Sequence, residues 1–232
     1  FYVWLMFPFS KPKTEEITVL DNFLEESDFK DLHTEVINCN AWGYTGGISV
    51  DDEGDPKVYY GFSSGVIDDY DESDDAKENY LFGEGPHINL VKQLNDKVKD
   101  YFNFKQVIRS RLDMTTYRGD NEIIFGPHID CDREHMTSIF YVTDSDAPTI
   151  IYNEKRFCGD VPKDMILTEK QRVMPKQNRL VVFPGNHIHT GMCPIKYPMR
   201  ILVNTNYRGI RKKDYQGPLY APWTKVLEGR LK

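Results

Sequence analysis

The stretch QVIRSRLDMTTY, residues 106–117, shows the pattern that decides the fold. Arg111 and Asp113 fall on one face of an extended chain, and Leu112 and Met114 fall on the other. An alternation of this kind, with a period of two, is typical of a β-strand. Many short strands at regular spacing predict a β-sandwich or jelly roll. Six more β-rich segments follow, separated by turn residues: EIIFGPHI, MTSIFYVT, PTIIYN, RVMPKQNRLVVF, HIHTGM and RILVNTNY.

Upstream of these strands the sequence predicts two amphipathic helices. One covers residues 25–38, and the other starts near Pro86 and continues to about residue 102. We therefore expect a mostly β (α+β) protein with supporting helices, folded as one domain over residues 1–232. Its parts would be a helical support with an acidic insertion (about 1–104), a β core (about 105–210) and a C-terminal tail (211–232).

Residues 43–85 are rich in Gly and Asp and contain the runs DDEGD (51–55) and DDYDESDDAKE (68–78). Charge runs of this kind are usually solvated surface, so we expect a loop. The alternative is a lid or a docking surface for a basic substrate. The apolar start FYVWLMFPF (1–9) is too short to span a bilayer and lacks signal-peptide features, so we expect a buried strand rather than a membrane anchor.

Net charge and cysteine content limit the partners and the location that we expect for this protein. The 232 residues carry a net charge of -7, which argues against a general nucleic-acid binder, because such a protein needs a basic face. The four cysteines form no C-x-x-C pair, so a zinc knuckle is not expected. Reduced thiols are typical of a cytoplasmic protein, which is the location we expect, with no nucleic-acid and no membrane partner.

The motif GPHID at 126–130 points to a metal site. His128 and Asp130 are two apart, so on a strand both side chains point to one face. A third ligand must come from elsewhere, and FPGNHIHTG offers His187 and His189, which strand parity cannot separate. We predict His189, because Arg200 follows it eleven residues downstream. Two histidines and one carboxylate on three corners of an octahedron leave three positions open, as in non-haem Fe(II) oxygenases.

These residues resemble the prolyl 4-hydroxylase branch of the Fe(II)/2-oxoglutarate-dependent oxygenase superfamily. His128-Ile129-Asp130 matches its H-x-D motif, and its phrase F-P…H…P…R/K is matched at Phe183, Pro184, His189, Pro194 and Arg200. The resemblance covers about residues 105–207. It implies a double-stranded β-helix core, which is jelly-roll or cupin-like, with Fe(II) held by His128, Asp130 and His189 as the catalytic centre.

The resemblance also implies a site for 2-oxoglutarate as co-substrate. Arg200 would bind its far carboxylate, and Tyr117 (in TYRGD) and Tyr141 (in TSIFYVT) would contact it. A planar guanidinium suits this role because it can bind both carboxylate oxygens. The sequence departs from the family pattern at two places, and both bear on which substrate is bound rather than on the chemistry. The family's Gly-Gly pair is replaced by residues 146–148 (Asp-Ala-Pro), and a common Trp is replaced by Asn206.

The implied reaction is hydroxylation coupled to oxidative decarboxylation of 2-oxoglutarate to succinate and CO2, with ascorbate as reductant. A prolyl residue in a peptide or protein is the expected substrate, and a small molecule or free amino acid is the alternative. Repair of alkylated bases is a weaker rival, because RILVNTNYR has the wrong spacing from His189 and the chain is acidic. A non-catalytic jelly-roll metal binder is a fourth reading, against which Arg200 argues.

Overall fold

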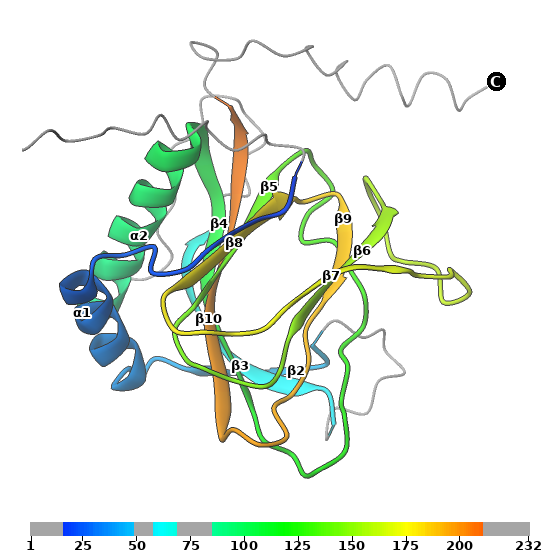
Figure 1. Cartoon of the computed structure of the whole chain (residues 1–232), viewed down its shortest axis with the longest axis horizontal. Helices are drawn as coiled ribbons and strands as arrows, with labels where there is room; N and C mark the ends of the chain where they lie inside the picture. The colour runs from blue at the N-terminus through cyan, green and yellow to red at the C-terminus, as the bar shows by residue number, and fades with distance from the viewer. Residues whose placement is uncertain (1–15, 49–57, 69–84, 211–232) are drawn as a thin grey trace, which may run out of the picture.

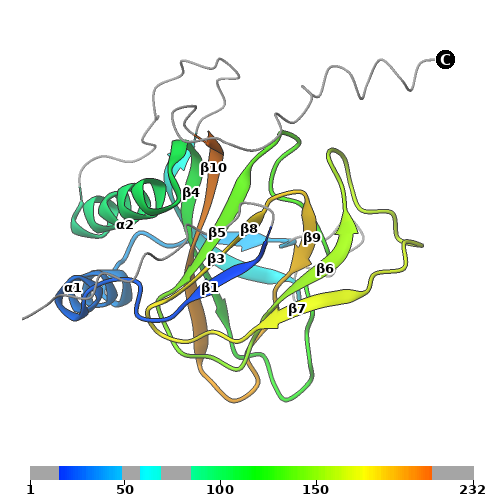
Figure 2. The same cartoon turned by 45° about the horizontal axis from the view of Figure 1, so that its top comes forward.

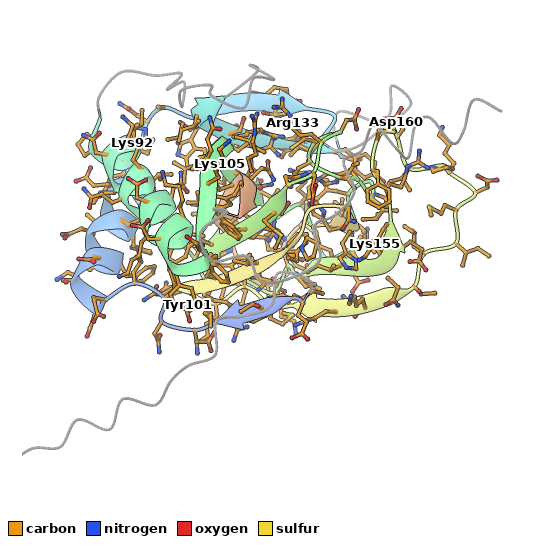
Figure 3. All side chains as sticks on the ribbon, turned by 90° about the horizontal axis from the view of Figure 1, so that it is seen from above. Lys92, Tyr101, Lys105, Arg133, Lys155 and Asp160 are labelled. Atoms are coloured by element: carbon orange, nitrogen blue, oxygen red, sulfur yellow. The ribbon has the colours of Figure 1, made fainter. Side chains whose placement is uncertain are left out.

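The computed structural model describes residues 16–48, 58–68 and 85–210. Both predicted helices are confirmed, as α1 (Glu26–Ile37) and α2 (Pro86–Phe102). Pro86 stands in the first turn of α2, where a missing N–H costs nothing, and Asn103 ends the helix in the left-handed conformation. Figure 3 shows side chains radiating from α2, with Lys92 in its first half and Tyr101 near its end. Neither helix is long and apolar enough to cross a membrane.

Two antiparallel sheets form the rest of the described structure. The larger has the strand order β1-β8-β5-β10-β4-β3-β2, and the smaller has the order β7-β6-β9. In Figures 1 and 2 both helices lie on one side of the larger sheet and the smaller sheet lies on the other. The bounds are β1 Thr18–Leu20, β2 Gly43–Gly46, β3 Tyr60–Asp68, β4 Phe104–Thr116, β5 Met136–Tyr141, β6 Thr149–Lys155, β7 Glu169–Val173, β8 Arg179–Pro184, β9 His187–Thr190 and β10 Met199–Ile210.

The two faces of the larger sheet bury different side chains. On β10, Ile201 and Val203 pack in the core beneath the helices, with Leu32 of α1 and Val91 of α2. Leu202, between them, joins a second core that includes residues of the smaller sheet. The period-two alternation read from the sequence therefore places one face of each central strand against the helices and the other toward the space between the sheets. The β-rich jelly-roll core predicted from the sequence is confirmed.

The register of β4 and β10 brings their polar residues to this inner space. Arg200 lies opposite Thr115, Asn204 lies opposite Arg111, and Asn206 lies opposite Arg109. Directly opposed residues of an antiparallel pair share a face. The polar faces predicted for these two strands therefore merge into one surface.

The expectation of a loop over 43–85 is wrong in part, because β2 and β3 lie inside this stretch. β3 pairs with β4 from Phe62↔Met114 to Asp68↔Arg109, and it buries Val66 and Ile67. The Gly and Ser residues of β3 break the alternation of apolar and polar residues by which a strand is recognised in a sequence. The strand forms because it pairs with the edge of β4. β1 was not predicted either. The run DDEGD, the acidic run beyond Asp68, the apolar start and the tail 211–232 lie outside the described residues.

Candidate metal centre

His128 and Asp130 lie in the connection between β4 and β5, and the expectation that they stand on a regular strand is wrong. Only isolated bridges form here, Ile124↔Met192 and His128↔His189. Pro127 has no N–H to donate to a ladder, which explains why the pairing is interrupted. The second bridge still has two backbone hydrogen bonds of 3.0 Å, one in each direction between His128 and His189. This bridge sets the two imidazole rings side by side, with centroids 4.7 Å apart.

Asp130 completes a three-residue cluster. Its Oδ1 lies 3.9 Å from Nε2 of His128, and its Oδ2 lies 3.6 Å from Nε2 of His189. The ligand atoms of all three residues lie within 4.8 Å of one another, and within the described ranges they form the one cluster able to hold a metal. Two imidazole nitrogens and one carboxylate oxygen are a donor set that suits Fe(II).

Both histidines present the correct nitrogen. Nδ1 of His128 is 3.0 Å from the carbonyl oxygen of Gly126, and Nδ1 of His189 is 3.1 Å from that of His187. A carbonyl only accepts, so each Nδ1 carries the proton and each Nε2 keeps its lone pair for the cluster. Hydrogen bonds of this kind fix the tautomer and ring orientation of metal-binding histidines.

The protonation states also favour a cation. Burial opposes ionisation of Asp130, but the neighbouring His189, His128 and Arg109 outweigh it and hold the pKa of this carboxyl well below its usual value. Burial lowers the pKa of His189 to about 4, so the imidazole is neutral at pH 7. The cluster therefore presents a carboxylate with a neutral histidine, which is the form that binds metal.

His187, the rival ligand, is turned away from this cluster. Its Nδ1 donates to the carbonyl oxygen of Tyr152 at 2.7 Å, and its Nε2 lies 3.3 Å from Nζ of Lys170. The cluster holds His189 and not His187. The side chain of His187 is buried, and that burial lowers its pKa to about 4.

This burial leads to a pH prediction for the metal-free protein. Unfolded His187 titrates near pH 6.5, whereas in the folded state it stays neutral down to about pH 4. Below pH 6.5 the unfolded chain binds the extra proton, so the stability present above pH 6.5 is lost progressively as the pH falls toward 4. We expect His187→Gln to show a smaller fall in melting temperature between pH 7 and pH 4.5 than the wild type. Parallel melting curves against pH would contradict the expectation.

A cavity of about 330 Å³ adjoins the cluster and contains Arg200. Arg200 as a whole residue is 6% exposed. One of its terminal nitrogens donates to Oγ1 of Thr149 at 2.7 Å, and its Nε is buried without a hydrogen-bond partner. No carboxylate among the described residues forms an ion pair with it. Asp113, on the wall of the same cavity, acts on this cation from a longer range and is itself paired with Arg111. A buried cation without a direct ion pair is costly, so the cavity suits an anionic ligand.

Two further groups stand beside this cation. The hydroxyl of Tyr141 donates to Oγ1 of Thr149 at 2.7 Å, and the Tyr141 ring lies 5.7 Å from the guanidinium carbon of Arg200. Burial raises the pKa of Tyr141, so the phenol keeps its proton and remains a donor. Gly191 allows the approach of Arg200, because a Cβ there would lie only 3.2 Å from a guanidinium nitrogen.

The structure does not bring Tyr117 to this cavity. Its side chain is 47% exposed, and its hydroxyl donates to Asp120 at 2.8 Å. β4 ends at Thr116, so the alternation that would align Tyr117 with Thr115 stops one residue too early. Thr149, in contrast, was missed from the sequence. The only signal was a polar residue at the start of the apolar segment PTIIYN.

The comparisons place this geometry among known folds. No family model matches the chain, and no curated protein matches its sequence. An oxidoreductase of the 2OG-Fe(II) oxygenase family from Burkholderia pseudomallei is similar with a TM-score of 0.57 and 9% identity, over 83% of this chain and 84% of that one. A prolyl hydroxylase from Trichoplax adhaerens, in complex with a hypoxia inducible factor peptide fragment, has a TM-score of 0.54 and 12% identity, with 84% of both chains covered.

A third similar structure is the non-heme alpha ketoglutarate dependent epimerase SnoN from nogalamycin biosynthesis. Its TM-score is 0.56 at 10% identity, over 90% of this chain and 88% of that one. At these identities the likeness establishes a shared fold, the β-rich jelly roll of 2-oxoglutarate/Fe(II) oxygenases.

Proposed function

We propose that this protein is a 2-oxoglutarate- and Fe(II)-dependent oxygenase that hydroxylates its substrate. One observation carries the proposal: Arg200, a buried cation with no direct ion pair among the described residues, lines the same cavity as the His128–Asp130–His189 cluster. A protein that only holds a metal has no need of such a cation. A co-substrate with one end for the metal and a far carboxylate for Arg200 accounts for both features.

Each residue then has a defined role. His128, Asp130 and His189 would hold Fe(II) beside the cavity. Arg200 and Tyr141 receive the far carboxylate of 2-oxoglutarate, and Thr149, which is bonded to both, orients them. When bound, the iron would supply the oxidative chemistry that converts 2-oxoglutarate, oxygen and the substrate to succinate, CO2 and the hydroxylated substrate. Ascorbate would keep the iron reduced.

For the substrate we propose a prolyl residue in a peptide or protein. The Trichoplax adhaerens hydroxylase, which shares the fold, was solved with a peptide fragment bound. In this chain β2 and β3 contribute Thr45, Phe62 and Ser63 to the cavity wall, so a substrate in the cavity would contact these strands.

A small-molecule substrate is the second candidate, and one observation favours it. Arg109 and Arg111 line the cavity close to Asp130, and Arg111 is paired with Asp113 through a 2.8 Å contact. With Arg111 already paired to Asp113, the guanidinium of Arg109 is the one that suits a substrate with its own carboxylate, such as a free amino acid. SnoN, which has the same fold, is named for a biosynthetic reaction.

Succinate release separates these readings. The protein would be incubated with Fe(II), ascorbate and 2-oxoglutarate, alone and with a library of prolyl peptides or a panel of free amino acids. We expect peptides to raise succinate release above the basal rate, and mass spectrometry to find one added oxygen on proline. Stimulation by free amino acids alone would favour the second candidate. No succinate under any condition would contradict an oxygenase.

The role of Thr149 is testable with an isosteric variant. Thr149→Val removes the hydroxyl that bonds both Tyr141 and Arg200 but keeps the volume of the side chain. Because a hydrogen bond to a charged group contributes about 1.5–3 kcal/mol, we expect 2-oxoglutarate to bind roughly ten- to a hundredfold more weakly. The measurement is a 2-oxoglutarate titration of the metal-loaded protein. Thr205→Val, a buried threonine on the opposite face of β10, is the control and should leave this affinity unchanged.

A further inference from the structure

Three buried donors hold the carboxylate of Asp130 from behind. Nδ2 of Asn206 donates to Oδ2 at 2.9 Å, and Oγ1 of Thr137 donates to the same oxygen at 3.1 Å. Nδ2 of Asn204 donates to Oδ1 at 3.3 Å. Thr137 and Asn206 are almost fully buried, and Asn204 is 7% exposed. The three donors therefore act in a region from which water is largely excluded.

The fold explains why these donors converge. Asn204 and Asn206 are two apart on β10, so they share the face that looks toward the smaller sheet. Thr137 on β5 lies directly opposite Asn206 in the strand register. The amide of Asn206 is also 3.2 Å from the hydroxyl of Thr137, so the two donors brace each other. The arrangement is thus built into two central strands rather than into a loop.

We propose that Asn206, with Thr137 and Asn204, positions Asp130 as a metal ligand; this inference rests on the proposed metal site. Oδ2 accepts hydrogen bonds from both Asn206 and Thr137, whereas Oδ1 accepts from Asn204 alone and keeps a lone pair for a metal beside His128. Rotation of the carboxylate about its bond to Cβ would break these hydrogen bonds in a buried site. The donors therefore hold it in one orientation before any metal arrives, and partners of this kind are known to raise metal affinity.

The orientation of Asn204 supports this role. Its Oδ1 is buried and has no hydrogen-bond partner, while its Nδ2 points at Asp130. An orphaned buried oxygen costs free energy, and the opposite orientation would set this oxygen against a carboxylate. The negative charge of Asp130 thus decides how the amide lies. Asn206 stands where the prolyl 4-hydroxylase branch commonly has a Trp. In this chain its side chain contacts Asp130, a proposed metal ligand, instead of a substrate.

Asn95 provides a matched control for a purely structural role. It is also a buried asparagine, 2% exposed, and its amide donates to Oγ of Ser110 at 2.8 Å. Its Oδ1 accepts from Thr205 of β10 at 2.9 Å. It therefore braces the same strand from the helix side without a contact to Asp130.

The test is a Co(II) titration of the metal-free full chain, followed by the visible spectrum of the bound ion. The variants are Asn206→Leu, which keeps the volume without the donors, and the pair Thr137→Val and Thr137→Ser, which differ in the hydroxyl. We expect Asn206→Leu and Thr137→Val to raise the Kd for Co(II) about 10–100-fold and to change its spectrum. Thr137→Ser should keep the wild-type values, and Asn95→Leu should lower the melting temperature while leaving Kd and spectrum unchanged.

The outcomes separate this inference from the proposed function. Wild-type Kd and spectrum in both Asn206→Leu and Thr137→Val would overturn the positioning role while leaving the metal site intact. A wild-type protein that binds no Co(II) would overturn the metal site and the inference with it. Should Asn206→Leu fail to fold, the Thr137→Val and Thr137→Ser pair decides the matter by itself.

Discussion

Alanine at Asp130 or His189 abolishes metal binding and turnover, whereas alanine at His187 preserves both: this is the result that the geometry leads us to expect. Asp130 supplies the only carboxylate of the cluster, and His189 supplies a nitrogen 3.6 Å from it. A site with three protein ligands that loses one of them keeps too few to hold the ion against water. His128→Ala should behave in the same way.

His187→Ala is a close control for His189→Ala, because the two histidines have similar surroundings. The two histidines are two residues apart, both are buried, and burial lowers the pKa of each to about 4. They differ in what they face: His187 is bonded to the carbonyl of Tyr152, and His189 lies beside Asp130. Fe(II) or Co(II) titrations of the two alanine variants measure the difference. Metal binding that survives His189→Ala and is lost in His187→Ala would assign the third ligand to His187.

Arg200→Ala should leave metal affinity nearly unchanged and weaken 2-oxoglutarate binding by orders of magnitude. Removing one member of a buried charge pair costs about 3–5 kcal/mol, much of it from the charge left without a partner. That range corresponds to a loss of roughly a hundred- to several-thousandfold in affinity. Arg200→Lys should recover part of the loss, because the charge remains but the two-pronged contact does not.

The measurement is a 2-oxoglutarate titration of the metal-loaded protein for the wild type and both variants. Arg172→Ala is the control, since Arg172 is half exposed and pairs with Glu169 at the surface. Equal affinity in the wild type, Arg200→Ala and Arg200→Lys would remove Arg200 from the site. It would also remove the main reason to assign 2-oxoglutarate to this cavity.

Local patterns in the sequence determined the helices, most strands and the chemical types at the site. Apolar spacing predicted α1 and α2, and alternation predicted both the strands of the core and the polar faces of β4 and β10. These features are local, because a side chain's direction follows from its own position in a helix or strand. A local pattern failed at β3, whose partners on β4 lie between 41 residues (Asp68↔Arg109) and 52 residues (Phe62↔Met114) further along the chain.

Only the tertiary structure decided which of these residues meet. His187 and His189 have the same strand parity, and only the spacing to Arg200 favoured His189 in the sequence. The bridge between His128 and His189 is what brings the His189 ring into the cluster. Tyr117 does not reach the cavity, because β4 ends one residue before it. Thr149, on a strand of the smaller sheet, contacts Arg200 although the sequence did not single it out. Asn206 was read from the sequence as a departure on the substrate side, yet it contacts Asp130. For the histidines, Thr149 and Asn206 the physical reason is the same. A hydrogen bond between residues distant in sequence depends on strand register, which the whole sheet fixes and no short segment encodes. For Tyr117 the reason is the residue at which β4 ends.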